Sequence, residues 1–271
     1  MLHIKKLLDL SDMMGLLSGG QGFETKLDLT EEKEGLIFWR ISYRENILIY
    51  QRMNKDYYFN KLYPLQDKII KIINSLGTNF YLTGGTASSR GYLNHRFSDD
   101  LDFFVNDDDK FGLWNDRLVH SITATKSWGV KVEQRDERFC RVALTFDEIF
   151  LKIEMVNDVP SYIGAVKTDK ILGRLDNPEN ILANKVSAVV DRKEPKDLAD
   201  IWGFCAQMNL SLKNALNNAE SKAAGIFPPD LARVLCSATR EDWEAVRWIK
   251  RPECDIFLNK LHTLGEELVF E

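Results

Sequence analysis

Residues 81–105, YLTGGTASSRGYLNHRFSDDLDFFV, decide the fold that we expect for this chain. The stretch opens with apolar residues, which is typical of a short buried strand. Gly84 and Gly85 follow, and they allow the backbone to turn sharply and to approach a ligand closely because glycine has no Cβ. Residues 87–93 are compatible with a short helix. Its first backbone N–H groups and the Thr86 hydroxyl are therefore candidates for binding a phosphate.

A second strand is expected at the end of the same stretch, over residues 100–105, DLDFFV. Side chains alternate along a strand, so Asp100 and Asp102 share one face while Leu101 lies on the other, and we expect Asp99 to point away from the pair. Two carboxylates on one rigid face suit Mg²⁺, or Mn²⁺ in its place, because such an ion takes few protein ligands and shares the rest with substrate phosphates. Taken singly, the glycine pair also fits an ordinary turn, and the two aspartates also fit a solvated strand.

Joined in this order, the motifs resemble the DNA polymerase β type of nucleotidyltransferase, and most closely the AbiEii/MenT group of bacterial toxin-like nucleotidyltransferases. The segments LTGGTA (82–87) and RFSDDLDFF (96–104) carry that resemblance, which covers roughly residues 55–205. It implies a nucleoside triphosphate substrate and a Mg²⁺-dependent attack of an acceptor hydroxyl on the α-phosphorus, with release of pyrophosphate. In this family the acceptor is often the 3′ end of transfer RNA, and a cognate antitoxin protein restrains the activity.

The strand expected over residues 149–156 places Lys152 and Glu154 on one face. Charged side chains among apolar neighbours are costly in a core, so that face is either solvent or part of the site. If the strand lies beside Asp100 and Asp102, Glu154 is a third carboxylate that orients or deprotonates the attacking hydroxyl. The family usually has Lys-x-Asp here, and glutamate is one methylene longer.

Residues 181–188 resemble the family's Leu-x-x-Lys-x-x-Ala helix, in which Lys185 would contact nucleotide phosphate. The alternative for Lys185 is a surface lysine whose stem lies along apolar neighbours. Residues 192–200 resemble the family's Arg-x-x-x-Arg-Asp-x-x-Asp segment, with lysine in place of the second arginine. We expect Asp197 to hold Lys185 or Arg192 in the site, although its position near a helix start also fits a capping role.

The resemblance and the residue pattern together give the expected site. The catalytic residues are Asp100, Asp102, Glu154, Lys185 and Asp197, with Asp100 and Asp102 as metal ligands; Gly84, Gly85, Thr86, Lys152, Lys185 and Arg192 bind the nucleotide. Asp200 is a secondary candidate.

The whole chain has 271 residues and a net charge of −5, which argues against a surface coated in basic charge but leaves room for a local basic groove. Its four cysteines show no C-x-x-C spacing, so we expect reduced thiols and no zinc site. No run reaches transmembrane length, and the start lacks an apolar signal core. These features predict a cytoplasmic protein with no membrane partner.

We expect an α/β (α+β) fold with a polymerase-β-like nucleotidyltransferase core and a mixed sheet, followed by a helical C-terminal domain. Residues 130–156 have the pattern of an antiparallel meander, and the chain from Pro178 onward reads as helical. The expected divisions are an N-terminal extension of unknown role at 1–52, the core at 53–170 and the helical domain at 171–271.

Two other functions remain open from the sequence. One is a nucleotidyltransferase that modifies a small molecule such as an aminoglycoside. The other is a catalytically silent relative that binds a nucleotide or a partner protein, against which the three carboxylates argue. A basic groove that reaches the site would favour RNA as the acceptor.

Overall fold

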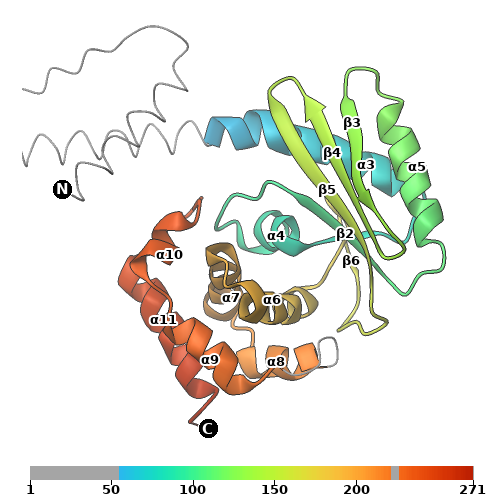
Figure 1. The fold of residues 1–271 in the computed structure, drawn as a ribbon. Coiled ribbons are helices and arrows are strands. Elements are labelled where there is room, and N and C mark those ends of the chain that lie inside the picture. The colour runs from blue at the N-terminus through green and yellow to red at the C-terminus, as the bar shows by residue number, and fades with distance from the viewer. Residues whose placement is uncertain (1–54, 221–225, 271) are drawn as a thin grey trace, which may run out of the picture. The chain divides into compact units, whose positions relative to one another are not determined.

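The computed structural model describes residues 55–220 and 226–270 (Figure 1). The chain divides into two compact units, residues 1–51 and 52–271, and the described residues belong to the second. The expectations for residues 1–52 lie outside the described residues. Division of the second unit at residue 170 stays a prediction.

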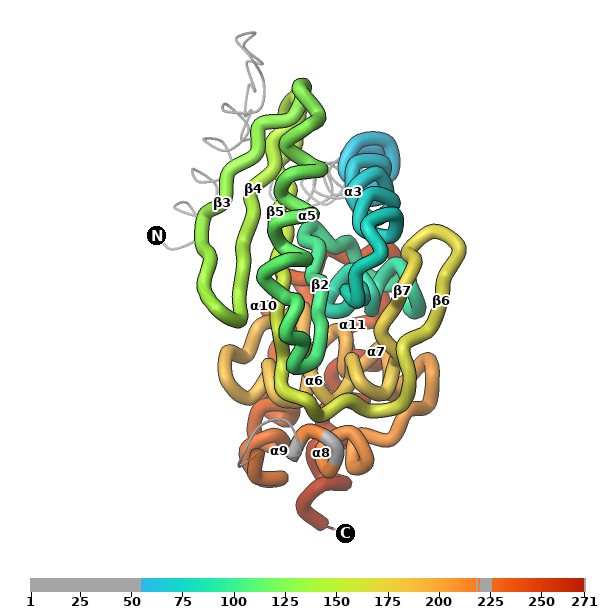
Figure 2. The backbone as a smooth tube through the Cα atoms, turned by 90° about the vertical axis from the view of Figure 1, so that its right-hand side faces the viewer, coloured from blue at the N-terminus to red at the C-terminus, as the bar shows by residue number. Residues whose placement is uncertain are grey.

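A seven-stranded mixed sheet forms one part of the described chain, in the order β3-β4-β5-β2-β1-β7-β6. The strands are β1 (Tyr81–Thr83), β2 (Leu101–Asn106), β3 (Gly129–Arg135), β4 (Phe139–Phe146), β5 (Ile149–Asp158), β6 (Lys167–Asp169) and β7 (Gly173–Leu175). Strands β3, β4 and β5 pair antiparallel, as the meander pattern predicts. Figure 2 shows β3 and β6 at the two edges of the sheet.

The centre of the sheet confirms the strand pairing on which the site depends. β1 lies antiparallel to β2, with Thr83 opposite Asp102. On its other side β2 runs parallel to β5, with Asp102 opposite Glu154. Because paired positions face the same side of a sheet, Thr83, Asp102 and Glu154 form a row across three strands.

Two helices cover the face of the sheet opposite that row: α3 (Tyr63–Ser75), preceded by the short helix η1 (Tyr58–Leu62), and α5 (Phe111–Thr123) (Figure 1). The alternating pattern of β2 explains this arrangement. Leu101 and Phe103 are buried while Asp102 between them is partly exposed. Gly77, with φ of +62°, follows the end of α3 in the left-handed conformation that glycine adopts readily.

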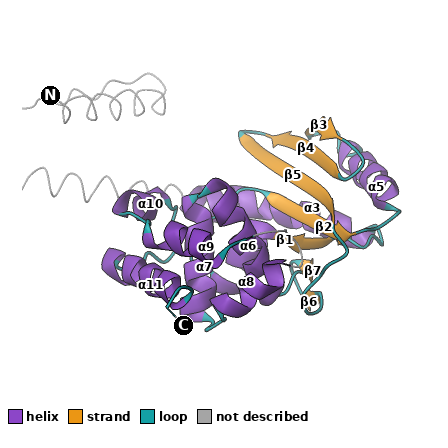
Figure 3. Ribbon diagram, turned by 60° about the horizontal axis from the view of Figure 1, so that its bottom comes forward, coloured by secondary structure: helices purple, strands orange, loops and turns teal. Residues whose placement is uncertain are grey.

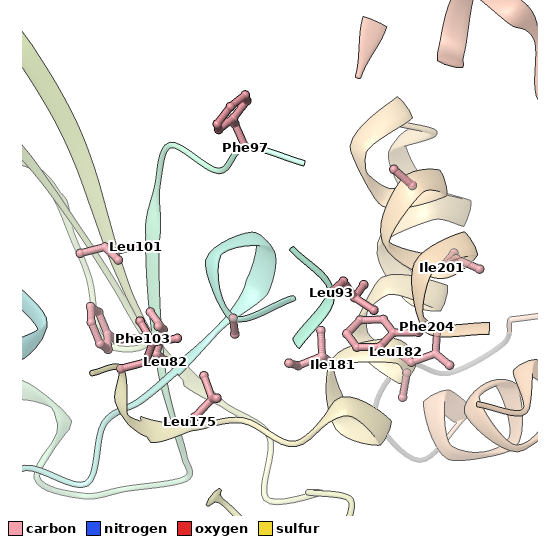
Figure 4. Packing of buried hydrophobic residues seen from close by; sticks show 14 of the residues in the cluster. Leu82, Leu93, Phe97, Leu101, Phe103, Leu175, Ile181, Leu182, Ile201 and Phe204 are labelled. Atoms are coloured by element: carbon pink, nitrogen blue, oxygen red, sulfur yellow. The ribbon is translucent and has the colours of Figure 1, made fainter. Parts of the chain in front are cut away.

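The helical part gathers at one end of the sheet (Figure 3). Its helices are α6 (Pro178–Arg192), α7 (Pro195–Gln207), α8 (Leu212–Glu220), α9 (Pro228–Cys236), α10 (Arg240–Ala245) and α11 (Cys254–Glu267). Between sheet and helices lie α4 (Gly84–Thr86) and η2 (Ala87–Leu93). Figure 4 shows Leu93 of η2 close to Leu182 and Phe204, so one apolar core continues from the sheet into α6 and α7.

The short strands β6 and β7 are absent from the sequence-based expectations. They pair antiparallel with each other, and β7 runs parallel to β1 with Leu175 opposite Leu82. Each has only three residues, which is too short for an alternation pattern to be recognised. None of the helices within the described ranges combines the length and the apolar character needed to cross a membrane.

Candidate active site

The glycine turn after β1 is shaped by two side chains of the protein itself. Gly84 has φ of +64°, and a Cβ at this position would lie 2.1 Å from Oδ2 of Asp102. A Cβ on Gly85 would lie 2.9 Å from both Nη2 of Arg96 and Oγ of Ser98. The two glycines are therefore needed because Asp102 and Arg96 lie directly against the turn.

The Thr86 hydroxyl takes a different role from the expected one. Thr86 is fully buried, and its Oγ1 donates a hydrogen bond of 2.5 Å to the main-chain oxygen of Asp100. Contrary to the expectation from the sequence, this hydroxyl is not open to a phosphate. Instead it fixes the turn to the residue that precedes β2.

Three carboxylates, those of Asp100, Asp102 and Glu154, gather beside the turn, and two of them are paired with cations. Nζ of Lys152 lies 3.0 Å from Oδ2 of Asp100 and 3.5 Å from Oε1 of Glu154. Nε of Arg141, on the neighbouring strand β4, donates to the same Oε1 of Glu154 at 2.7 Å. The sheet thus brings together Asp100, Asp102, Glu154 and Lys152, as the sequence predicts. The sequence does not predict Arg141 as part of the site, because its contact with Glu154 depends on the pairing of β4 with β5.

The neighbouring Asp99 faces away from this group, as expected from strand alternation. Its carboxylate accepts hydrogen bonds from the Tyr58 hydroxyl and from the guanidinium of Arg247. Both partners come from parts of the chain far from Asp99 in sequence. Asp99 therefore anchors the loop and leaves Asp100 and Asp102 to the site.

Asp102 lies beside two other carboxylates, those of Glu154 and Asp100. Burial, together with the charges of Glu154 and Asp100, raises the pKa of Asp102 to about 6, although Lys185 and Lys152 act in the opposite direction. A carboxylate whose charge is disfavoured by its neighbours is stabilised when a divalent cation binds beside it. The oxygen donors present therefore fit Mg²⁺ or Mn²⁺.

The metal ligands themselves stay a prediction. Within residues 55–220 and 226–270, no group of three or more histidine, cysteine, aspartate and glutamate side chains has the geometry of a metal centre. Asp100 and Asp102 are a pair, which leaves most of the coordination shell to substrate and water, the arrangement usual for Mg²⁺.

Lys185 lies in the interior and contacts two aspartates of α7. Its side chain is only 7 % exposed, and its Nζ lies 2.7 Å from Oδ1 of Asp197 and 2.8 Å from Oδ2 of Asp200. Burial would lower the pKa of Lys185, but Asp200 and Asp197 outweigh it and raise the pKa. Lys185 is thus a charged interior residue and not a surface lysine.

Asp197 is fully buried, and its two oxygens bind different cations. Oδ1 accepts from Lys185, and Oδ2 accepts from Nε of Arg192 at 2.8 Å. The Arg192 side chain is 47 % exposed, so it extends from this buried anchor toward solvent. The expectation that Asp197 holds Lys185 or Arg192 understates the geometry, because it holds both.

Asp200 has more partners than the sequence suggests. Arg96 donates to both of its oxygens, from Nε at 2.8 Å and from Nη2 at 2.7 Å, and Nε2 of His95 lies 3.1 Å from Oδ1. Burial would raise the pKa of Asp200, but Arg96 and Lys185 outweigh it and hold the pKa well below its usual value. Burial lowers the pKa of His95, so its neutral ring donates from Nε2.

The two groups of charges influence each other. Lys185 lowers the pKa of Asp102, and Asp102 in turn is among the charges that raise the pKa of Arg192. The carboxylates of the sheet therefore lie within electrostatic range of the cations of α6. An acidic position for a metal ion and basic positions for phosphate lie side by side, which is the charge pattern that a nucleoside triphosphate requires.

A comparison with known protein families identifies the family of this chain. Residues 72–248 match the model of the nucleotidyl transferase AbiEii toxin family of type IV toxin–antitoxin systems. The chain belongs to the AbiEii family. It is accordingly a nucleotidyltransferase, and the resemblance, the fold class and the enzyme class expected from the sequence are confirmed.

A comparison with solved structures finds similar chains at low sequence identity. JHP933 from Helicobacter pylori is 20 % identical with a TM-score of 0.51, over 74 % of this chain and 88 % of that one. MenT4, a nucleotidyltransferase toxin from Mycobacterium tuberculosis, is 14 % identical with a TM-score of 0.41, over 76 % of this chain and 82 % of that one. No curated protein matches the sequence.

Proposed function

We propose that this AbiEii-family enzyme transfers a nucleotide from a nucleoside triphosphate to the 3′-hydroxyl of transfer RNA, and that it acts as a toxin restrained by a cognate antitoxin. The observation that carries the proposal is the row formed by Asp102 and Glu154, with Asp100 beside it, against the glycine turn. A protein that only binds a partner has no need of three crowded carboxylates, each of which costs free energy near the others.

Each carboxylate has a separate task in this proposal. Asp100 and Asp102 hold Mg²⁺ or Mn²⁺, which when bound offsets the negative charge of the triphosphate. Glu154 orients or deprotonates the attacking hydroxyl. Both of its cationic partners contact Oε1, which fixes the side chain. In this proposal Oε2 accepts from the attacking hydroxyl. Positioning of this kind supplies much of the rate enhancement in phosphoryl transfer.

In this proposal the cations of α6, Lys185 and Arg192, bind the phosphates. An ammonium group has three N–H donors, and Asp197 and Asp200 take two of those on Lys185, which leaves one for a phosphate oxygen. Arg192 reaches solvent from its anchor on Asp197 and presents a second cationic group. The main chain of the turn at Gly84 and Gly85 binds the triphosphate in this proposal, and Lys152 neutralises the carboxylates until substrate binds.

Incubation with labelled substrates tests the proposal directly. The purified chain is mixed with total RNA and each of the four α-labelled nucleoside triphosphates, with Mg²⁺ or with a chelator. We expect label in RNA of transfer RNA size, and none when periodate has first destroyed the 3′ cis-diol. Labelling that survives periodate would place the acceptor elsewhere. Labelling of an added aminoglycoside, and of no RNA, would favour the small-molecule acceptor.

Expression in a bacterial host tests the toxin role. We expect growth to slow with the wild-type chain and to recover with Asp102→Asn, which keeps the shape of the side chain but removes its charge. Equal growth inhibition by both proteins would separate toxicity from nucleotide transfer. Co-expression of the neighbouring reading frame tests for the antitoxin.

A further inference from the structure

A basic segment, residues 247–251 (RWIKR), follows α10 and returns to residues 95–100, the loop before β2, which we call the catalytic loop. The main-chain N–H of Phe97 donates to the oxygen of Arg247 at 2.8 Å, and the N–H of Ile249 donates to the oxygen of His95, also at 2.8 Å. These bonds fix the segment to the stretch that leads into β2. The segment is therefore held against the loop that leads to Asp100 and Asp102.

Trp248 anchors the middle of the basic segment. It is buried, and its ring lies against those of His95, Trp202 and Phe257, with centroid distances of 6.2, 6.2 and 5.6 Å. Edge-to-face contacts of this kind hold a ring in one orientation. With Trp248 fixed in the core, the cationic neighbours of the segment are presented to solvent from a rigid backbone.

Three cations of the segment, Arg247, Lys250 and Arg251, are exposed. Arg247 binds Asp99, the neighbour of the metal-binding aspartates, and its guanidinium lies 5.6 Å from the ring centroid of Tyr58. The guanidinium carbon of Arg251 lies 3.6 Å from the centroid of the Trp243 ring. Neither Lys250 nor Arg251 forms an ion pair with any residue of the described ranges.

This concentration of positive charge contrasts with the whole chain, whose formal net charge is −5. Exposed cations without acidic partners attract polyanions, and a fixed backbone lowers the conformational entropy lost on binding. The segment lies one residue from Asp100 through its contact with Asp99. A polyanion bound there would lie beside the loop that leads to Asp100 and Asp102.

We propose that the basic segment binds phosphates of the RNA acceptor close to its reacting 3′ end. This inference rests on the proposed function, because it takes RNA as the acceptor. Lys250 and Arg251 each bind a backbone phosphate, and such contacts position a nucleic acid without reading its sequence. The segment therefore places the acceptor strand and leaves base selection to other parts of the protein.

The test compares two double variants. Lys250→Ala with Arg251→Ala removes the two unpaired cations and keeps the Trp248 anchor. Lys126→Ala with Lys131→Ala is the matched control, since both are exposed lysines and Lys131 lies on the edge strand β3, separated from β2 by two strands. The KM for transfer RNA and the KM for the nucleoside triphosphate are measured at several salt concentrations.

We expect the first variant to raise the KM for transfer RNA and to leave the KM for the nucleotide unchanged. Each phosphate contact to a single strand contributes about 0.7 to the slope of log affinity against log salt, so losing two lowers the slope by about 1.4. Between about 50 and 200 mM salt, the factor by which KM increases should then be about sevenfold smaller for this variant than for the wild type. The control variant should behave as wild type.

Other outcomes overturn the inference in distinguishable ways. If the KM for transfer RNA and its salt slope stay at wild-type values while RNA is still labelled, the inference fails and the proposed function stands. If those values are unchanged but the variant no longer binds the antitoxin, the segment is a protein-binding surface. If the wild-type enzyme labels no RNA, the proposed function and the inference fail together.

Discussion

Gly84→Ala tests the geometry of the site separately from the stability of the fold. Gly84 has φ of +64°, and an added Cβ would lie 2.1 Å from Oδ2 and 3.1 Å from Cβ of Asp102. Gly77 has almost the same conformation, with φ of +62°, but an added Cβ there meets nothing within 4 Å. Gly77→Ala is therefore a matched control that carries the backbone strain without the collision.

The backbone strain caused by alanine should be similar in both variants, because the two glycines have nearly the same φ. A left-handed conformation costs an L-residue about 1–2 kcal/mol, and alanine recovers about 0.4–1 kcal/mol because it restricts the unfolded chain. We expect each variant to lose about 1 kcal/mol of unfolding free energy, which corresponds to a fall of about 2–4 °C in Tm for a chain of this size.

The collision adds a functional cost to Gly84→Ala. To reach ordinary contact distance, the Asp102 carboxylate must retreat from the new methyl group by about 1 Å, given the 2.1 Å separation. Rotation of a side-chain end is cheap in stability, but a displacement of about 1 Å in a catalytic group lowers turnover about 100-fold. The retreat takes Asp102 out of line with Glu154.

Two measurements separate these effects. Circular dichroism gives the Tm of both variants, and incorporation of labelled nucleotide at saturating substrate gives kcat. We expect similar Tm values, a kcat about 100-fold below wild type for Gly84→Ala, and a kcat within about twofold of wild type for Gly77→Ala. Wild-type turnover by Gly84→Ala would refute the assignment, because Asp102 would then be free to move without effect.

Three further predictions concern the charges. Asp102→Asn should lower kcat at least about 100-fold with the fold intact by circular dichroism, whereas Asp99→Asn, on the outward-facing neighbour, should have a smaller effect. Lys185→Met removes a buried partner of two aspartates that keep other cations, so urea unfolding should show a loss of about 1–3 kcal/mol, and wild-type stability would argue against the buried network. The depressed pKa of Asp200 stabilises the fold fully above the unfolded-state pKa of about 3.9, and this stabilisation is lost as the pH falls through the folded-state pKa. The difference in unfolding free energy between wild type and Asp200→Asn should therefore be constant near neutrality and shrink below about pH 4.

The sequence predicts those parts of the fold that are encoded by local pattern. Strands β1 and β2, the antiparallel group β3 to β5 and the helices from Pro178 onward follow from alternation, glycine positions and apolar spacing. The candidate carboxylates follow for the same reason, because Asp100 and Asp102 are separated by one residue on a strand. The pairing of β2 with β5 then brings Glu154 beside them.

Contacts between segments far apart in the chain could not be predicted from the sequence. Strands β6 and β7 depend on pairing with β1, and neither has a pattern of its own. The buried position of Thr86 arises from its bond to the main chain of Asp100, which no spacing rule anticipates. The basic segment at 247–251 is visible as a charge cluster in the sequence, but its place beside the catalytic loop comes only from the fold.

The buried ion pair of Arg96 and Asp200 shows why the helical part is necessary to the glycine turn. Arg96 lies against Gly85 on one side and donates two hydrogen bonds to Asp200 on the other, across a sequence separation of 104 residues. A buried guanidinium without a carboxylate would be strongly destabilising. The glycine turn is therefore held in place by α7, and the same Asp200 also contacts Lys185. In the proposed function the turn binds the nucleotide and Lys185 binds its phosphate. A change at Asp200 should then disturb both at once.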